Sequence, residues 1–272
     1  MIRIGGATRV GAVLGWPVAH SASPALHNAA FAALAIDAVF VALAVPPPEL
    51  PAAVRGLAAL GVLGASVTVP HKQAVLALCD DVDPDAARIG AVNCLAFADR
   101  RITGHNTDAG GFLDALAELG RDPRGARAVL LGAGGAARAV AVALAGAGAL
   151  TVDVVARAPA AVDWCAARRW TDAELAALLP TCDVLVDCTP VGLGRDQSFP
   201  AEVSIDLLPP AAAVCALSYG PPGSTLVAAA RARGLPAMDG GAMLVHQGAR
   251  AFALWTGRPA PVDVMRAALP RG

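Results

Sequence analysis

The residues that decide the fold are Ala128-Val129-Leu130-Leu131-Gly132-Ala133-Gly134-Gly135-Ala136-Ala137-Arg138. The apolar start predicts a buried strand and the alanine-rich end predicts a helix. Between them lies Gly-x-Gly-x-x-Ala, the pattern of a dinucleotide-binding loop. Gly132 would permit the tight turn, Gly134 would let the backbone approach a pyrophosphate, and Ala137 would let the helix pack closely on the sheet. A chain with 28 glycines can match this pattern by chance in a structural turn, but the position between strand and helix favours a dinucleotide site.

Outward from this stretch, short runs rich in Val, Ile and Leu alternate with alanine-rich stretches long enough for helices. This alternation is typical of βαβ units around a mostly parallel sheet, so it predicts the α/β class. The predicted strands are 10–14, 39–44, 64–69, 94–97, 128–131, 151–155, 184–188 and 213–217. The predicted helices are 24–35, 49–60, 71–79, 109–119, 135–147, 171–179, 224–233 and 241–255.

The choice of dinucleotide depends on the end of the strand 151–155. NAD-binding folds usually place an acid there for the ribose 2′-hydroxyl. In this chain Asp153 lies too early, inside the strand, and Ala156-Arg157-Ala158 follows. The guanidinium of Arg157 suits a 2′-phosphate and can stack on adenine. The pattern therefore favours NADP, with NAD as the alternative.

Composition excludes several classes of function. The formal net charge is −1, from 21 Lys+Arg and 22 Asp+Glu, so no basic field exists to hold nucleic acid or an anionic membrane. Mean hydropathy is +0.56, but 65 alanines account for most of it. The long charge-free stretches are broken by polar residues or prolines, and the N-terminus lacks a signal-peptide pattern. These features predict a cytoplasmic protein.

The six cysteines and five histidines show no spacing typical of a metal or redox site. There is no Cys-x-x-Cys pair and no His-x-x-x-His pair. We therefore expect buried, reduced thiols and no metal.

Two segments of the first half carry polar residues that packing does not require. In Ser21-Ala22-Ser23-Pro24, an extended loop would point both hydroxyls the same way. The alternative is that Ser23 caps the helix that Pro24 starts. In Val67-Thr68-Val69-Pro70-His71-Lys72, the end of a strand presents Thr68 and the following helix turn presents Lys72. Alone, Lys72 is more often a solvated surface lysine.

A third polar segment is Gly104-His105-Asn106-Thr107-Asp108, just before a predicted helix. The simplest interpretation of Asp108 is that its carboxylate caps this helix.

Taken together, these segments resemble the shikimate dehydrogenase family, which reduces 3-dehydroshikimate to shikimate with NADPH. The resemblance covers nearly the whole chain and keeps the order of the motifs. The family signatures are Ser-x-Ser-Pro, Val-Thr-Val-Pro-His-Lys, Ile89-Gly90-Ala91-Val92-Asn93, Asn106-Thr107-Asp108, the glycine loop 132–138, Cys188-Thr189-Pro190-Val191-Gly192 and Asp239-Gly240-Gly241-Ala242-Met243-Leu244-Val245-His246-Gln247.

The resemblance implies roles for particular residues. Lys72 and Asp108 would be the catalytic pair. The substrate would be bound by Ser21, Ser23, Thr68, Asn93, Tyr219 and Gln247, and the cofactor by Gly132, Ala133, Gly134, Gly135, Ala136, Ala137, Arg157 and Gly240. One departure concerns the cofactor: many members have Asn-Arg-Thr where this chain has Ala156-Arg157-Ala158, so two polar contacts to the adenosine phosphate are missing.

The length of 272 residues suits two domains. The segment 120–127 concentrates charge, Pro and Gly, which is typical of a linker or surface turn. The family pattern implies a substrate-binding catalytic α/β domain, 1–107 plus 240–272, with a mostly parallel sheet. It also implies a Rossmann-type, doubly wound NADP-binding domain, 108–239, and places the substrate in the cleft between the two domains.

We therefore expect an NADP-dependent oxidoreductase that interconverts 3-dehydroshikimate and shikimate in chorismate and aromatic amino-acid biosynthesis. One alternative is an NAD-dependent quinate/shikimate dehydrogenase; the two serines and the missing acid argue against it. The other is a catalytically silent sensor of nucleotide or shikimate, disfavoured because Lys72 and Asp108 are both present. We expect no nucleic-acid or membrane partner, and either a monomer or a homodimer.

Overall fold

The computed structural model describes residues 4–189, 191, 199, 202–220 and 223–270. Two signature residues, Pro190 and Gly192, lie outside the described residues. The described chain divides into two compact units, residues 4–111 with 244–270 and residues 112–243. The divisions fall inside helices α4 (Thr107–Glu118) and α8 (Gly240–Thr256), four residues later than the predicted domain boundaries in both cases.

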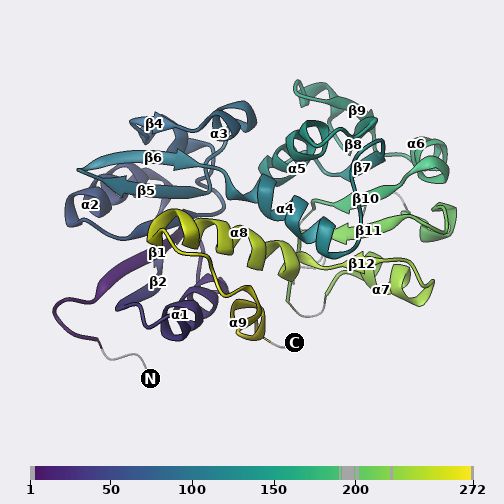
Figure 1. The fold of residues 1–272 in the computed structure, drawn as a ribbon. Helices are drawn as coiled ribbons and strands as arrows, with labels where there is room; N and C mark the ends of the chain where they lie inside the picture. Colours follow the sequence, from purple (N-terminus) through teal and green to yellow (C-terminus); the bar gives the residue numbers. More distant parts are fainter. Residues whose placement is uncertain (1–3, 190, 192–198, 200–201, 221–222, 271–272) are drawn as a thin grey trace. The chain divides into compact units, whose positions relative to one another are not determined.

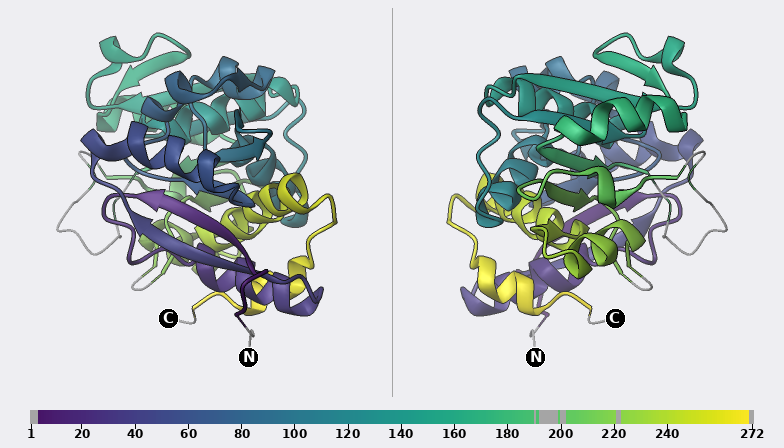
Figure 2. Two further views of the ribbon diagram at one scale, coloured as in Figure 1. Left: turned by 90° about the vertical axis from the view of Figure 1, so that its left-hand side faces the viewer. Right: turned by 90° about the vertical axis from the view of Figure 1, so that its right-hand side faces the viewer.

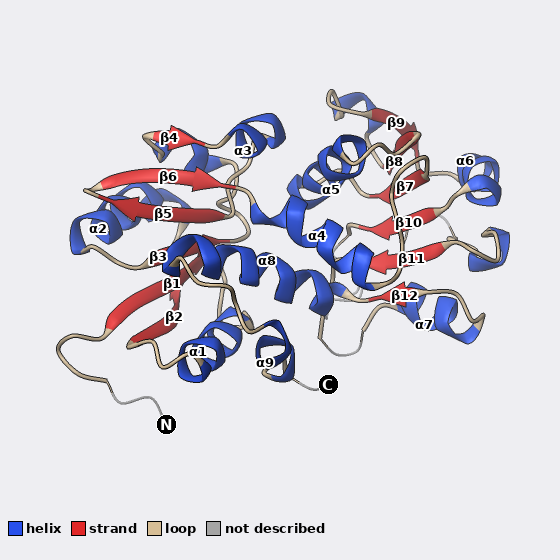
Figure 3. Cartoon of the chain, viewed as in Figure 1, coloured by secondary structure: helices blue, strands red, loops and turns tan. Residues whose placement is uncertain are grey.

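The first unit is built on a six-stranded sheet in the order β2-β1-β3-β5-β6-β4 (Figure 1). Only β5 runs antiparallel to its neighbours, β3 and β6, among these described strands (Figure 3). The strands are β1 (Arg9–Gly15), β2 (Ala38–Ala44), β3 (Gly64–Val67), β4 (Asp81–Val82), β5 (Cys94–Ala98) and β6 (Arg101–His105). The helices that lie wholly in this unit are α1 (Ser23–Ala33), α2 (Leu50–Leu60), α3 (Pro84–Ile89) and α9 (Val262–Ala267).

Two cores cover the faces of this sheet. On one face, α2 packs on strand residues such as Leu14, Ala65 and Leu95. On the other face, α1 and α8 contribute an aromatic cluster that includes His27, Phe252 and Trp255. Helix α9 lies beside α1 (Figure 1; Figure 2). The sheet is therefore buried on both sides, which explains the apolar runs of its central strands.

Gly64 on β3 permits the close packing of α8 on this sheet. A Cβ atom at residue 64 would lie 2.2 Å from Cδ1 of Trp255, so a larger residue would displace the indole. Trp255 also donates a hydrogen bond from Nε1 to the backbone oxygen of Leu95, at 3.0 Å. The last long helix is thereby held against the first unit.

The second unit is built on a fully parallel six-stranded sheet in the order β12-β11-β10-β7-β8-β9. Helix α5 packs on one face of the sheet, and α6 and α7 pack on the other. The strand order reverses between β7 and β10, which is where doubly wound folds bind ligands. The strands are β7 (Arg127–Leu131), β8 (Thr151–Ala156), β9 (Ala166–Arg169), β10 (Val184–Asp187), β11 (Ala213–Ala216) and β12 (Ala237–Met238). The helices are α5 (Gly135–Gly146), α6 (Asp172–Leu178) and α7 (Thr225–Ala232).

The structure confirms the α/β class and the eight predicted strands, whose ends differ from the prediction by two residues at most. Seven of the eight predicted helices are present. The helix predicted at 71–79 is wrong: the segment begins as a turn and continues as a short 3₁₀ helix, Ala74–Leu78. His71 explains this, because its Nε2 lies 2.8 Å from the backbone oxygen of Val45 and its backbone N–H bonds to the oxygen of Thr68. These contacts hold the chain in a turn.

Six elements were not predicted from the sequence: β4, β6, β9, β12, α3 and α9. These elements are short, and two of the strands carry arginine, so their own residues give little periodic signal. The segment 120–127 is a loop and the start of β7 within the second unit, so it does not link the two units. No helix in the described part of the chain is long and apolar enough to cross a membrane.

Candidate active site

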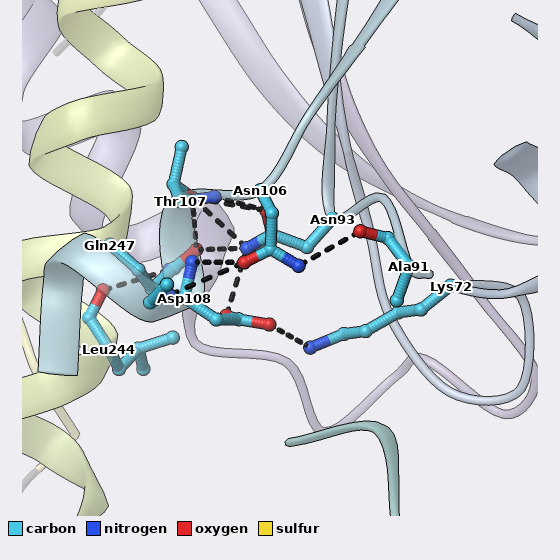
Figure 4. Close-up of polar contacts among 9 residues, drawn as sticks. Lys72, Ala91, Asn93, Asn106, Thr107, Asp108, Leu244 and Gln247 are labelled. Atoms are coloured by element: carbon cyan, nitrogen blue, oxygen red, sulfur yellow. Dashed lines mark hydrogen bonds and ion pairs between the residues drawn. The ribbon is translucent and has the colours of Figure 1, made fainter. Parts of the chain in front are cut away.

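The start of helix α4 is held by Asn106. Its Oδ1 accepts hydrogen bonds from the backbone N–H groups of Asp108 and Ala109, at 3.1 and 3.3 Å. Its Nδ2 donates to the backbone oxygen of Ala91, at 2.9 Å (Figure 4). The expectation that Asp108 caps this helix is therefore wrong. Because the amide of Asn106 fills the capping position, the carboxylate of Asp108 is free to bind other groups.

The carboxylate of Asp108 binds Lys72. Nζ of Lys72 donates to Oδ2 of Asp108 at 2.7 Å. The Asp108 side chain is 7% exposed, whereas the Lys72 side chain is 21% exposed. Asp108 also lies in the first turn of α4, where the helix dipole stabilises a negative charge. The pair thus consists of a buried, fixed carboxylate and an ammonium that still reaches solvent.

Asn93 links this ion pair to the helices α4 and α8. It lies directly before β5, and its Nδ2 donates to Oδ1 of Asp108 at 2.9 Å. The same nitrogen lies 3.0 Å from Oγ1 of Thr107 and 3.3 Å from Oε1 of Gln247. Its Oδ1 accepts the backbone N–H of Thr107, and Gln247 donates from Nε2 to the oxygen of Leu244 at 2.9 Å. Lys72, Asn93, Thr107, Asp108 and Gln247 form the Lys72 cluster (Figure 4), and all of these residues except Lys72 are buried.

Gly111 lets α4 and α8 approach closely beside the cluster. A Cβ atom at residue 111 would lie 2.6 Å from the backbone nitrogen of Gln247 and 2.7 Å from its Cα. Backbone atoms cannot move aside as a flexible side chain can. Gly111 and Thr107 were not predicted as site residues, although a Gly-Gly pair inside a predicted helix is a signal of close packing.

The second unit contains the glycine loop between β7 and α5. Gly132 has φ = +98°, a value that L side chains rarely adopt, and Ala137 is fully buried. Gly134 is the N-cap of α5, and a Cβ atom on Gly134 or Gly135 would meet nothing within 4 Å. The first turn of a helix leaves N–H groups without intrahelical acceptors. This open space beside free donors fits a pyrophosphate group.

Comparison with known proteins points to one family. Residues 13–95 match the model of the shikimate dehydrogenase substrate binding domain, and residues 242–269 match that of the shikimate 5′-dehydrogenase C-terminal domain. A protein named shikimate dehydrogenase (NADP(+)) from Symbiobacterium thermophilum is 46% identical over 277 residues, which is 97% of this chain and 94% of the relative. A protein of the same name from Methanopyrus kandleri is 44% identical over 275 residues, 96% and 95% of the two chains. The chain belongs to the shikimate dehydrogenase family.

A solved member of the shikimate dehydrogenase family has the same fold. The shikimate 5-dehydrogenase from Thermus thermophilus, in complex with NADP(H) and shikimate, is similar with a TM-score of 0.86 at 38% identity. The match covers 96% of this chain and 98% of that structure.

The family pattern selects three further residues in the first unit, Ser21, Ser23 and Thr68. The extended loop predicted for the serines is wrong, because Ala22 between them has the α conformation (φ −83°, ψ −6°). Ser23 is the first residue of α1 and makes no capping bond; its N–H instead bonds to Oγ of Ser21, at 3.3 Å. Thr68 follows the end of β3, and its methyl group packs over Gly15. No hydrogen bond among the described residues joins these three to the Lys72 cluster.

Besides the glycine loop, three further family positions lie in the second unit. Tyr219 is half-buried in the loop after β11. Gly240 begins α8 and donates its N–H to the oxygen of Ser218 at 2.9 Å. A Cβ atom on Gly240 would lie 2.2 Å from the oxygen of Leu217, so this turn requires glycine. Arg157 directly follows β8 and is exposed. Because Asp153 is bound by Nε of Arg168 at 2.9 Å, its carboxylate is already engaged.

Asp187, the last residue of β10, was also not predicted as a site residue. This carboxylate is 1% exposed, and its Oδ1 accepts from the backbone N–H and the hydroxyl of Thr189, at 2.9 and 2.7 Å. Burial raises the pKa of Asp187 above its ordinary value, and the two hydrogen bonds from Thr189 offset only part of this increase. The sequence feature that could have identified Asp187 is its charge, because it ends a strand whose other residues are all apolar. Asp187 thereby holds Thr189, whose methyl group lies next to Gly132 of the glycine loop.

Proposed function

We propose that this chain is an NADP-dependent shikimate dehydrogenase, which reversibly reduces 3-dehydroshikimate to shikimate. One observation carries the proposal: the partly exposed ammonium of Lys72 is held 2.7 Å from the buried carboxylate of Asp108. The names of the relatives and the ligands of the Thermus thermophilus structure support the choice of substrate and cofactor.

Lys72 would stabilise and protonate the carbonyl oxygen of the substrate. Reduction of a ketone places negative charge on oxygen, and a cation or acid within hydrogen-bond distance stabilises it. An ammonium has three N–H donors, and Asp108 takes one of them. The remaining donors of Nζ would bind the carbonyl oxygen and deliver a proton to it; in the reverse direction Nζ would accept the proton.

Asp108 would orient Lys72 and bind the substrate. Each carboxylate oxygen can accept two hydrogen bonds, and the structure uses one on Oδ1 and one on Oδ2. The free positions would accept a substrate hydroxyl beside the reacting carbon. Asn93 and Gln247 would bind ring hydroxyls. Ser21 and Ser23, together with Thr68 and Tyr219, would bind the substrate carboxylate with neutral donors.

NADP(H), when bound, supplies or accepts the hydride. The N–H groups of residues 132–137 would hold its pyrophosphate, Arg157 would bind its 2′-phosphate, and Gly240 would lie beside its nicotinamide. The engagement of Asp153 with Arg168 favours NADP, because NAD-binding folds use a free acid at this strand for the 2′-hydroxyl.

The primary test crosses shikimate and quinate with NADP⁺ and NAD⁺ and follows formation of the reduced nicotinamide. We expect turnover with shikimate and NADP⁺ to exceed the other three combinations. Turnover with quinate and NAD⁺ above that level would favour the quinate/shikimate alternative. Thermal stabilisation by shikimate without any turnover would indicate a sensor and refute the proposal.

The test of the catalytic pair uses Lys72→Met and Lys72→Arg. Loss of a positioned proton donor usually costs about 100-fold to 10,000-fold in rate, so we expect kcat of Lys72→Met to fall by this factor. Arg55→Met is the matched control, because Arg55 is an exposed cation of the same unit on α2. Removal of Lys72 alone leaves Asp108 buried without its cation, so Lys72→Met/Asp108→Asn, which removes both charges, separates loss of folding from loss of chemistry.

Lys72 is the only lysine in the chain, which permits a direct spectroscopic test. Protein labelled with ¹⁵N-lysine has a single lysine Nζ signal in an NMR spectrum. We expect shikimate to shift this signal in the wild type, and Asp108→Asn to shift it without substrate. A signal that shikimate leaves unchanged would contradict contact between Nζ and the substrate.

We also propose a cellular location and an oligomeric state for the enzyme. All six cysteines are free, and burial raises the pKa of Cys182 and Cys215 to about 12. Free thiols suit the reducing cytoplasm, where we place the protein. We expect a monomer or a homodimer, which sedimentation velocity distinguishes.

A further inference from the structure

The edge strand β9 places a second arginine at the same edge of the sheet as Arg157. Strands β8 and β9 are parallel, and their register pairs Ala156 with Arg169. Arg169 is the last residue of β9, and Arg157 is the first residue after β8. Paired residues of neighbouring strands lie about 5 Å apart. The two arginines therefore share the carboxyl edge of the sheet, the edge at which α/β folds bind ligands.

Strand alternation assigns Arg168 and Arg169 to opposite faces of the sheet. Arg168 binds Asp153 at 2.9 Å and Glu174 of α6 at 3.3 Å, so it lies on the face covered by α6. Arg169 consequently shares the other face with its partner Ala156. Ala156 belongs to the core cluster that contains Ala137 of the glycine loop and helix α5. Arg169 is thus on the side of the sheet where the nucleotide loop begins its helix.

The charges of the two arginines lack a counterion. Both residues are exposed, and among the described residues neither guanidinium has an ion-pair or hydrogen-bond partner. Arg168, one residue earlier, has two carboxylate partners. Two unpaired cations at the same edge of a sheet repel each other, and a dianion bound between them would offset this repulsion. The 2′-phosphate of NADP is such a dianion, and guanidinium groups bind phosphate through paired N–H donors.

We infer that Arg169 and Arg157 together form the site for the 2′-phosphate of NADP(H). The inference rests on the proposed function and extends it, since it assigns the preference for NADP over NAD to a residue from a different strand. Ala156 and Ala158 flank Arg157 and offer no polar side chain. Arg169 would supply the phosphate contact that these two positions lack.

The test measures binding of two nucleotides that differ only in the 2′-phosphate, adenosine 2′,5′-bisphosphate and adenosine 5′-monophosphate. Isothermal titration calorimetry of the full chain gives both affinities without any turnover. We expect Arg169→Gln to weaken the bisphosphate about tenfold to a hundredfold, the usual range for a hydrogen bond to a charged group, and to leave the monophosphate unchanged. Arg169→Lys should recover part of the loss, because the charge remains.

The matched control is Arg124→Gln, which removes an exposed arginine from the loop before β7. This loop lies at the amino end of β7, away from the carboxyl edge that carries Arg157 and Arg169. It should bind both nucleotides as the wild type does. In steady-state assays with shikimate, Arg169→Gln should raise KM for NADP⁺ and leave kcat unchanged. Circular dichroism checks that each variant is folded. If Arg169→Gln does not fold, the same measurements are made with Arg169→Lys.

The outcomes separate this inference from the proposed function. If the wild type binds the bisphosphate better than the monophosphate and Arg169→Gln keeps the full difference, the assignment of Arg169 is wrong and NADP dependence stands. If the wild type does not distinguish the two nucleotides, both the NADP preference and the 2′-phosphate site are wrong. If Arg157→Gln and Arg169→Gln each reduce the difference and the double variant abolishes it, the two-arginine site is supported.

Discussion

Burial of His27 in the aromatic cluster of the first unit predicts a loss of stability at acidic pH. His27 is fully buried, and neither ring nitrogen has a hydrogen-bond partner in the described part of the chain. Its ring stacks on Phe40 with 4.3 Å between centroids and lies 5.1 Å from Trp255. Burial lowers the pKa of His27 from 6.5 to about 3. The imidazole therefore stays neutral in the folded protein.

The sign and size of the effect follow from proton linkage. Between pH 6.5 and pH 3 the unfolded chain binds a proton at His27 and the folded chain does not, so stability falls as pH falls. Each pH unit well below 6.5 costs about 1.4 kcal/mol. Between pH 7.5 and pH 4.5 the loss from His27 alone is roughly 2.6 kcal/mol.

The assay is urea unfolding at pH 7.5, 6 and 4.5 for the wild type and His27→Leu, an apolar replacement of similar size. As the pH falls from 7.5 to 4.5, the free energy of unfolding of the wild type should decrease by about 2.6 kcal/mol more than that of His27→Leu. His20→Gln is the matched control, because His20 is exposed on the loop before α1. If the stabilities of wild type and His27→Leu change in parallel with pH, the reasoning from burial is refuted.

Three further predictions follow from the packing and capping described above. Gly111→Ala should lose about 1–3 kcal/mol of stability by overpacking, because its Cβ would lie 2.6 Å from a backbone nitrogen of α8; Gly56→Ala in α2, where a Cβ meets nothing within 4 Å, should not be destabilised in the same thermal melts. Asn106→Ala should lose about 1–2 kcal/mol with the cap of α4, and retention of wild-type stability would show that the cap contributes nothing. Cys182 and Cys215 should resist thiol reagents at pH 8 until the protein unfolds, since burial raises the pKa of both thiols to about 12; rapid labelling of either in the native protein, located by mass spectrometry, would contradict this.

The candidate site shows where prediction from sequence fails. Asp108 was expected to cap α4, because an acid before an apolar helix usually does so. The neighbouring Asn106 takes this role, because its Nδ2 is also held by the oxygen of Ala91, a residue on a different loop. Thr107 and Gly111 were not selected, since their importance comes from Gln247 on α8. Local patterns do not record such partners.

The sequence by itself determined most of the regular elements and the glycine loop. Strand and helix periodicity arises from residues that are neighbours in the chain, and the turn at Gly132 requires a residue that adopts a positive φ. Only the tertiary structure decided which groups meet: Lys72 binds a carboxylate 36 positions away, and Asn93 contacts a residue 154 positions away. The position of Arg169 at the same sheet edge as Arg157 likewise depends on strand register. Contacts between distant residues follow from how strands pair and helices pack, and no local preference encodes these arrangements.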